Sequence, residues 1–262
     1  MAITTLDGLI AAVKRRVILA KTTSRTSVAA IPFSVFDLAG NPGAGTLAVG
    51  NTANGLVHTD AINGYPSLPT PSGNLYISRA EARSPVACWL DVYDTLFSCG
   101  AYAFNANTTL ASQPSYSGRL PVAADYNGLE LWLEAVSTFT GLQSIQINYL
   151  DQGGAAGDTG VVATGVASTV GRMFQVPLAA GDSGIQQITQ VRSTVSSVGT
   201  FNVHVLRHLF GIRINAANQG EVQDFASLGM PKIFGDSALR LVVTADSTAT
   251  STPTVRMEVA DG

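Results

Sequence analysis

The chain has 262 residues, of which 46% are hydrophobic and 13% are charged, and its formal net charge is −3. This balance argues against a nucleic-acid-binding surface, which needs clustered Lys and Arg side chains. The sequence also has no uninterrupted apolar run of roughly 18 residues, the length that a membrane-spanning helix requires; the apolar run at 17–20, for example, lies between Arg16 and Lys21.

The low charge predicts a subunit of an assembly. An ordinary soluble domain has about 25% charged residues, and a solvated monomer places most of them on its surface. We therefore expect neighbouring proteins to cover much of this surface, beginning with copies of the chain itself in a trimer or another symmetric oligomer. The length fits one all-β domain of roughly 200–250 residues with an N-terminal extension.

The N-terminal residues predict a short helix. Thr4 or Thr5 is suited to cap it, and a basic cluster, 14–16, follows where the helix dipole favours cations. The charges follow the apolar stretch instead of preceding it, which is unlike a secretion signal, so we expect a protein that is made and used without export. The apolar residues with helical spacing are Leu6, Leu9, Ile10 and Val13.

Residues 32–71 predict an extended arm. They are dense in Gly, Asn, Pro and Thr, which favour turns and extended chain. A stretch of this length without periodicity is unusual inside a compact monomer, and it is stable when it lies across its own domain or a neighbour. Our hypothesis lays it over a neighbour. We accordingly expect residues 1–72 to form the helix and arm, and residues 73–262 to form the main domain.

After Gly73 the apolar residues recur with a period of two, which is typical of half-buried strands. Turn-forming stretches separate the runs, and long helices are not predicted. The pattern predicts an all-β fold, an antiparallel β-sandwich that is jelly-roll-like. We expect 238–245 and 254–259 to close the chain as a hairpin. The alternating runs begin at Leu75, Cys88, Leu129, Ile145, Phe201, Leu239 and Val255.

One quartet matches the surroundings of a serine-protease nucleophile. Gly-Asp-Ser-Gly at 181–184 contains Ser183, and His58 and Asp94 precede it in the chain order of chymotrypsin-like proteases. Ile185 follows where that family has Pro, and His58 lacks the expected neighbours. Gly and Asp are also ordinary turn formers. We therefore interpret the quartet as a hairpin turn and expect no catalytic residues.

Neither histidines nor cysteines predict a metal site. His204 and His208 are four residues apart in a predicted strand, which separates them by about 13 Å, too far to share an ion. We expect them at the surface or at an interface. Cys88 and Cys99 do not have zinc-ligand spacing, and the sequence leaves open whether they are free or joined. The glycine-rich 40–45 stretch matches no nucleotide-binding motif, so no cofactor is expected.

A second possible function is carbohydrate binding. Glu130 and Glu134 are expected on one strand face with Trp132, and such a face could hold a sugar ring; Trp89 is the other candidate. A solvated strand with a tryptophan at an interface has the same pattern. A receptor-recognition module therefore stays the alternative to an assembly subunit.

Four segments together resemble tailed-bacteriophage virion structural proteins: TTLDGLIAAVK, SVFDLAGNPGAG, GTFNVHVLRHLFGIRI and LRLVVTADSTATSTPTVRMEVADG. The likeness lies in texture and segment order over most of the chain. It implies a non-enzymatic capsid decoration, cement or capsid-associated protein of the head, or alternatively a neck, collar or tail protein. The implied partners are other virion proteins, without nucleic acid or membrane. The implied location is the virion, assembled in the host cytoplasm.

Overall fold

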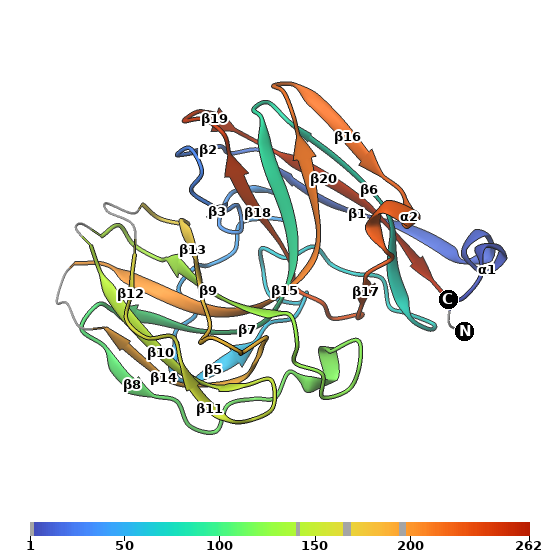
Figure 1. Cartoon of the computed structure of the whole chain (residues 1–262). Helices are drawn as coiled ribbons and strands as arrows, with labels where there is room; N and C mark the ends of the chain where they lie inside the picture. Colours follow the sequence, from blue (N-terminus) through green and yellow to red (C-terminus); the bar gives the residue numbers. More distant parts are fainter. Residues whose placement is uncertain (1–2, 140–141, 165–168, 194–197) are drawn as a thin grey trace. The chain divides into compact units, whose positions relative to one another are not determined.

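Antiparallel strands dominate the computed structural model of the chain (Figure 1), which describes residues 3–139, 142–164, 169–193 and 198–262. The prediction of an all-β antiparallel sandwich with a short N-terminal helix is confirmed. The chain divides into two units. Unit 1 comprises Met1–Gly45, Thr59–Asp94 and Leu209–Gly262, and unit 2 comprises Thr46–His58 and Thr95–His208.

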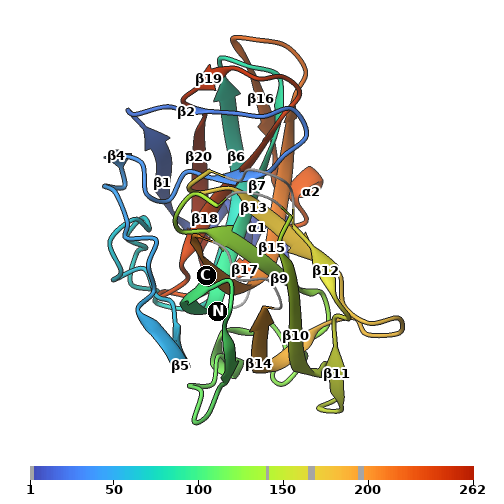
Figure 2. The ribbon, with the colours of Figure 1, turned by 90° about the vertical axis from the view of Figure 1, so that its left-hand side faces the viewer.

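Unit 1 contains two main sheets. The first has the order β16–β6–β20–β1–β4, with β17 also paired to β6, and Figure 2 shows β1, β20 and β6 side by side. The second contains β3, β18 and the residues of β7 and β15 that belong to this unit. A short pair, β2 and β19, completes the unit's strands. The bounds are β1 (Val13–Lys21), β2 (Arg25–Thr26), β3 (Phe33–Ser34), β4 (Gly40–Asn41), β6 (Leu75–Ser84), β7 (Cys88–Ala103), β15 (Thr200–Ile214), β16 (Gln219–Gln223), β17 (Lys232–Ile233), β18 (Leu239–Ala245), β19 (Thr250–Ser251) and β20 (Thr254–Asp261).

The two sheets of unit 1 share one apolar core. Val17 and Leu19 of β1 face it from the first sheet, and Leu90 of β7 and Leu241 of β18 face it from the second. Their period of two places every second side chain on the buried face, as the sequence predicts. Burial of each such side chain contributes about 1.5–3 kcal/mol, so this alternation holds the two sheets together.

The described residues of unit 2 also form two sheets. One has the order β11–β10–β14–β8, with β12 paired to β10; the other contains β13, β9, β5 and the residues of β15 and β7 that belong to this unit. A short 3-10 helix, η1 (Ser117–Arg119), precedes β9. The bounds are β5 (Asn51–Val57), β8 (Asn107–Thr109), β9 (Leu129–Ala135), β10 (Ser144–Asp151), β11 (Ala156–Asp158), β12 (Val162–Ala163), β13 (Met173–Val176) and β14 (Ile185–Ser193).

The core of unit 2 is separate from that of unit 1 and richer in aromatic rings. Phe104 lies with its ring centroid 4.6 Å from that of Phe139 and 4.8 Å from that of Phe201. Leu131 of β9 and Ile147 of β10 bring the two sheets onto this cluster. Tilted ring pairs at this separation stabilise a core beyond the area that they bury.

The predicted N-terminal helix is present as α1 (Leu6–Ala11), and Thr5 caps it by accepting a hydrogen bond from the Gly8 N–H at 3.1 Å. The helix ends earlier than its apolar pattern predicts, because Val13 already begins β1. The basic cluster 14–16 therefore lies in a strand. Lys14 nevertheless donates to the carbonyls of Leu9 and Ile10, at 2.9 and 3.3 Å, which places its charge at the helix C-terminus.

The predicted arm is built into the strands of both units. Residues 32–45 and 59–71 belong to unit 1, and residues 46–58, which include β5, belong to unit 2. With β1 also contributing to the core of unit 1, the stretch 1–72 supplies core residues and paired strands. Residues from both sides of position 72/73 therefore occur in unit 1, whereas unit 2 takes residues 46–58 from before it and 95–208 from after it.

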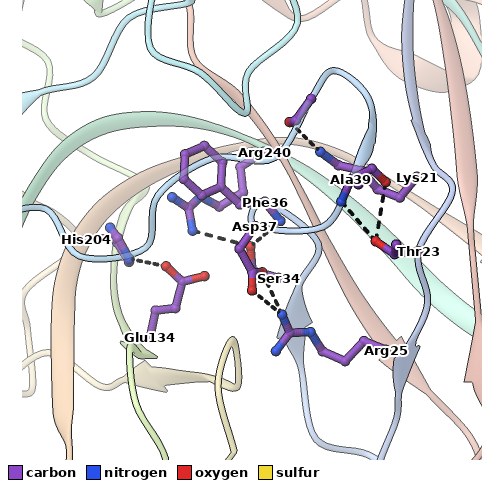
Figure 3. Close-up of polar contacts among 11 residues, drawn as sticks. Lys21, Thr23, Arg25, Ser34, Phe36, Asp37, Ala39, Glu134, His204 and Arg240 are labelled. Atoms are coloured by element: carbon purple, nitrogen blue, oxygen red, sulfur yellow. Dashed lines mark hydrogen bonds and ion pairs between the residues drawn. The ribbon is translucent and has the colours of Figure 1, made fainter.

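Arg240 holds part of this segment on unit 1 (Figure 3). The side chain is buried, and its guanidinium lies 4.6 Å from the ring centroid of Phe36 and 5.8 Å from that of Tyr65. It donates to Tyr65 Oη at 3.0 Å and to Ser34 Oγ at 3.4 Å. A Cβ on Gly64 would lie 2.5 Å from the Phe36 ring, so the segment needs glycine there. These contacts bind the segment to its own unit, whereas the sequence-based hypothesis laid it over a neighbour.

The predicted hairpin at the end of the chain is wrong. Strand β18 pairs with β7 and β3, whereas β20 pairs with β6 and β1. The two strands therefore lie in different sheets of unit 1, and residues 246–253 connect the sheets. Both strands alternate with the same period, and periodicity reports which face is buried but not which strand is the neighbour.

Candidate functional site

Three buried polar side chains form a chain of hydrogen bonds in unit 2. Ser98 Oγ lies 2.6 Å from His204 Nδ1, and His204 Nε2 lies 3.1 Å from Glu134 Oε2. The residues come from β7, β15 and β9, which lie in one sheet. Figure 3 shows the His204 ring directed at the Glu134 carboxylate. All three residues are fully buried, so the imidazole bridges a hydroxyl and a carboxylate away from bulk water.

This serine, histidine and glutamate are the residue types of a hydrolytic triad, in which a histidine takes the proton of the nucleophile and a carboxylate orients the ring. Here Ser98 is completely inaccessible, so a substrate has no route to its hydroxyl in this conformation. The arrangement instead satisfies buried polar groups across three strands. The expectation that His204 lies at the surface or an interface is wrong, while His208 is exposed.

No direct signal in the sequence marks this cluster. Ser98, Glu134 and His204 lie in strands whose apolar residues alternate with polar ones, a pattern in which polar residues are expected to face solvent. The middle of β7 and of β15 is buried on both faces. A polar residue in a strand can therefore face solvent or be buried with a hydrogen-bond partner. The alternation of polar and apolar residues does not distinguish these two environments.

The protease-like residues have other partners. Ser183 Oγ donates to Asn127 Oδ1, and the Ser183 N–H donates to Gln152 Oε1 at 2.9 Å. Asp94 belongs to unit 1, where it accepts from Ser237 Oγ at 2.7 Å and from the Ala238 N–H at 2.9 Å. The hydroxyl of Ser183 is thus bonded to an amide where a protease needs a histidine. The quartet at 181–184 begins in a turn, where the Asp182 N–H donates to the Ala179 carbonyl at 3.1 Å, and ends at Gly184, which forms a β-bridge with Asn127. It lies between β13 and β14, which belong to different sheets, so the predicted hairpin is wrong.

Both cysteines are free and buried, which settles the question that the sequence left open. Cys88 belongs to unit 1 and Cys99 to unit 2. Burial raises the pKa of Cys99 to about 12 and also raises that of Cys88, so both stay as unreactive thiols near neutral pH. Within the described ranges, no three His, Cys, Asp or Glu side chains gather as a metal site would require.

The tryptophan that could stack on a sugar is buried. Trp132 is 6% exposed, and its Nε1 donates to Glu130 Oε2 at 2.8 Å. Glu134, the second expected carboxylate, is inside the unit. Trp89 is 47% exposed, but the Arg213 guanidinium lies 5.7 Å from its ring centroid. The geometry therefore offers no accessible aromatic platform at Trp132.

The accessible surface of unit 2 has few charges. Unit 2 carries four of the 15 Lys and Arg and six of the 18 Asp and Glu. Four of these ten side chains are buried: Arg119, Glu134, Arg172 and Arg207. Those outside the core are Asp125, Glu130, Asp151, Asp158, Asp182 and Arg192.

Amide side chains replace charges on the outer face of the β11–β10–β14–β8 sheet. Asn148 of β10 donates to Gln190 of β14 at 3.3 Å, and Gln190 donates to Asn107 of β8 at 2.9 Å. Gln146 accepts from Arg192 at 3.3 Å in the next row. We call the four amide residues, Asn107, Gln146, Asn148 and Gln190, the amide face; the charged side chains of Arg192 and Asp158 hydrogen-bond to it at Gln146. Unit 2 also exposes large apolar side chains outside its strands, at Val122, Leu142 and Val161.

Unit 1 has an apolar groove beside its two helices, α1 and α2 (Phe225–Leu228). Leu6, Leu9, Phe225 and Met230 line a groove of about 270 Å³. Leu6 and Ile10 of α1 are 58% and 66% exposed. Contiguous exposed apolar side chains are typical of interaction surfaces and of ligand-binding grooves. No helix in the part of the chain that the structure describes is long and apolar enough to span a membrane.

Comparison with known proteins assigns no family. No protein-family model matches the chain, and no curated protein matches it. Among solved structures, particles derived from infectious bursal virus with T=1 symmetry match at 9% identity and a TM-score of 0.19, over 95% of this chain and 78% of that one. The Gt strain of infectious bursal disease virus matches at 11% identity and a TM-score of 0.19, over 95% and 81%. The T13 particle of the same virus matches at 8% identity and a TM-score of 0.20, over 96% and 78%. A TM-score this low establishes neither a shared fold nor a shared role.

Proposed function

We propose that the chain is a non-enzymatic structural subunit of a virus particle, which assembles through contacts with copies of itself and with other virion proteins. The observation that carries the proposal is the surface of unit 2, where amide and apolar side chains outnumber the six accessible charges. Amides and apolar groups cost less to remove from water than charges. A surface of this composition is suited to burial against other proteins.

The buried polar residues support a structural role. Ser98, His204 and Glu134 are residue types that an enzyme would place in a cleft. Here they form buried hydrogen bonds that link three strands. The apolar groove of unit 1 adds a second surface suited to a partner. The finer proposal is a bacteriophage head protein of the decoration, cement or capsid-associated kind, and it rests on the resemblance of the four sequence segments. A neck, collar or tail role is the alternative within the same class.

The proposal is tested by quantitative mass spectrometry of purified particles from the source organism. The chain should be present at a fixed ratio to the major shell protein. A ratio near one to one supports a head location, and a far smaller ratio supports the neck, collar or tail. Absence from particles that contain the other virion proteins would overturn the proposal.

A further inference from the structure

The first sheet of unit 1 has an open edge along β1. This strand pairs with β20 from Val13 to Ala20, but it pairs with β4 only at Ala20 and Lys21. Among the described residues, no strand pairs with the other edge of β1 between Val13 and Leu19. At the opposite end of the same sheet, β16 pairs with β6 alone. Each of these edges presents unpaired main-chain groups, which form a template for a further strand.

The register shows which main-chain groups of β1 face outward. The Thr22 N–H donates to the Ala39 carbonyl at 2.8 Å, directly after the β1–β4 pairing. The register between β1 and β20 contains no bulge. In an antiparallel ladder, alternate residues turn their N–H and C=O groups to opposite sides. Counting back from Thr22, the main-chain groups of Lys14, Arg16 and Ile18 therefore point to the open edge.

The two edges carry opposite charge. Lys14, Arg15 and Arg16 of β1 are all exposed, while β16 carries Glu221 and has no Lys or Arg. Arg15 lies opposite Val259, and Glu221 lies opposite Ala82. Val259 and Ala82 are core residues, and directly opposite residues share a face of the sheet. Arg15 and Glu221 therefore project from the same, core-facing side of the sheet at its two ends.

Basic side chains on an edge strand commonly prevent pairing between copies. That protection acts against a like-charged edge, so it disfavours pairing of β1 with the β1 of another copy. The basic side chains do not oppose pairing with β16, because the carboxylate of Glu221 would lie beside the basic edge of β1. The charges thus favour one of the possible edge pairings over the others.

We propose that the β1 edge of one copy of this chain pairs with the β16 edge of a second copy, so that the first sheet of unit 1 continues from subunit to subunit. The inference rests on the proposed function, since it names a self-association surface of the structural subunit. Main-chain hydrogen bonds supply the attraction, and Arg15 facing Glu221 selects the partner edge. Each pairing leaves one β1 and one β16 edge free, so the contact is head-to-tail and closes only as a ring.

A charge exchange in the full-length protein tests this pairing. Arg15→Glu and Glu221→Lys each place like charges across the interface, and each should weaken self-association by about tenfold or more, measured by sedimentation velocity over a range of concentrations. The double variant restores opposite charges and should restore association. Asp236→Lys is the matched control for Glu221→Lys, because it makes the same charge change at an exposed residue of unit 1 that belongs to neither β1 nor β16, and it should leave association unchanged.

A second variant tests the main-chain hydrogen bonds without changing charge. Ile18→Pro removes an N–H that points to the open edge and leaves the hydrogen bonds to β20 in place. It should abolish association while the thermal unfolding transition and far-ultraviolet circular dichroism stay close to those of the parent protein. Should Ile18→Pro fail to fold, the charge exchange still decides the question.

Three outcomes would overturn the inference: association that neither single charge variant weakens, a double variant no better than the singles, or a parent protein that stays monomeric at every concentration. None of these removes the chain from purified particles. The mass-spectrometric test of the proposed function is therefore independent of the test of edge pairing.

Discussion

Unit 1 and unit 2 are similar in size and enclose apolar cores between antiparallel sheets, yet they use charge in opposite ways. Unit 1 carries eleven of the 15 Lys and Arg and twelve of the 18 Asp and Glu, and only Lys21, Asp94 and Arg240 of these are buried. Unit 2 carries the remaining ten charged residues and buries four of them. The low average charge of the chain thus conceals a difference between twenty accessible charged residues in unit 1 and six in unit 2.

This contrast indicates where each kind of specificity lies. In unit 1, charges remain accessible, both on interior strands of the first sheet, as at Arg79 and Arg256, and along its edge strand β1. In unit 2, buried charged side chains have hydrogen-bond partners inside the fold, as Glu134 has in His204 and Arg119 has in the Thr95 carbonyl, and amide side chains bond to one another on the outer face of the β11–β10–β14–β8 sheet. Four experiments test the contrast.

The strongest destabilisation is expected from Arg240→Ala. The substitution removes a buried guanidinium and leaves Ser34 Oγ and the rings of Phe36 and Tyr65 without it. We expect a loss of about 3–5 kcal/mol in the free energy of unfolding of unit 1. Each unit contains one tryptophan, Trp89 in unit 1 and Trp132 in unit 2.

Tryptophan fluorescence therefore follows the urea unfolding of one unit at a time. In the Trp132→Phe background the remaining Trp89 reports on unit 1, and in the Trp89→Phe background Trp132 reports on unit 2. Only the Trp89 signal should shift to lower urea. Arg256→Ala, an exposed arginine of the same unit, serves as the control and should change stability by less than about 0.5 kcal/mol. An equal shift of both tryptophan signals would show that the two units unfold in one cooperative transition and would contradict an effect confined to unit 1.

Lys21 should make the stability of unit 1 depend on pH. Its Nζ donates to the carbonyls of Pro42 and Gly43, at 3.0 and 3.2 Å, and burial lowers the pKa of this lysine to about 8. Between pH 8 and about 10.5 the unfolded chain holds a proton that the folded chain has released, so stability from this group rises with pH in that window. Below pH 8 both states are charged and the gain is absent.

The measurement is the unfolding free energy of the parent protein minus that of Lys21→Met, which removes the effects of other titrating groups. This difference should increase from pH 8 to pH 10.5 by up to about 3 kcal/mol. Titration of the lysine by NMR should give a midpoint near 8. A flat difference across this range would show that Lys21 is solvated when folded.

Glu134→Gln tests the buried polar network of unit 2. It removes the charge that lies 3.1 Å from His204 Nε2 while keeping the size of the side chain. We expect a loss of about 2 kcal/mol, because a buried imidazole loses a charged acceptor. Ser98→Ala should cost about 1 kcal/mol. The Trp132 signal reports both, and an unchanged transition in Glu134→Gln would show that the pair contributes nothing to unit 2.

The weakest effect on folding is expected on the amide face. Gln146→Lys with Gln190→Lys places two charges on it and should change the unfolding free energy by less than about 0.5 kcal/mol. Incorporation into particles should nevertheless fall, because two ammonium groups would have to be desolvated. Ala217→Lys with Thr248→Lys adds the same charge to exposed positions of unit 1 and is the control. Normal incorporation of the Gln146 and Gln190 variant would exclude the amide face from assembly contacts.

Much of the local structure was predictable from short-range patterns. The period of two located the strands that begin near Leu75, Leu129 and Val255, and Thr5 marked the start of the N-terminal helix. These features depend on residues a few positions apart, where capping and one-sided burial leave a direct trace. The interpretation of Ser183 as a non-catalytic residue also rested on its neighbours in the sequence.

The pairing of the strands, and every feature that depends on it, was established only by the tertiary structure. Strands β18 and β20 have the same alternation and lie in different sheets. His204 has the appearance of a surface residue and is buried against Ser98 and Glu134. Pairing joins residues far apart in the chain, and alternation records only that one face is covered. Composition, periodicity and caps therefore specified the class of fold, while the two cores, the buried polar cluster and the open edge of β1 arise from nonlocal pairing that a single sequence does not encode in any short segment.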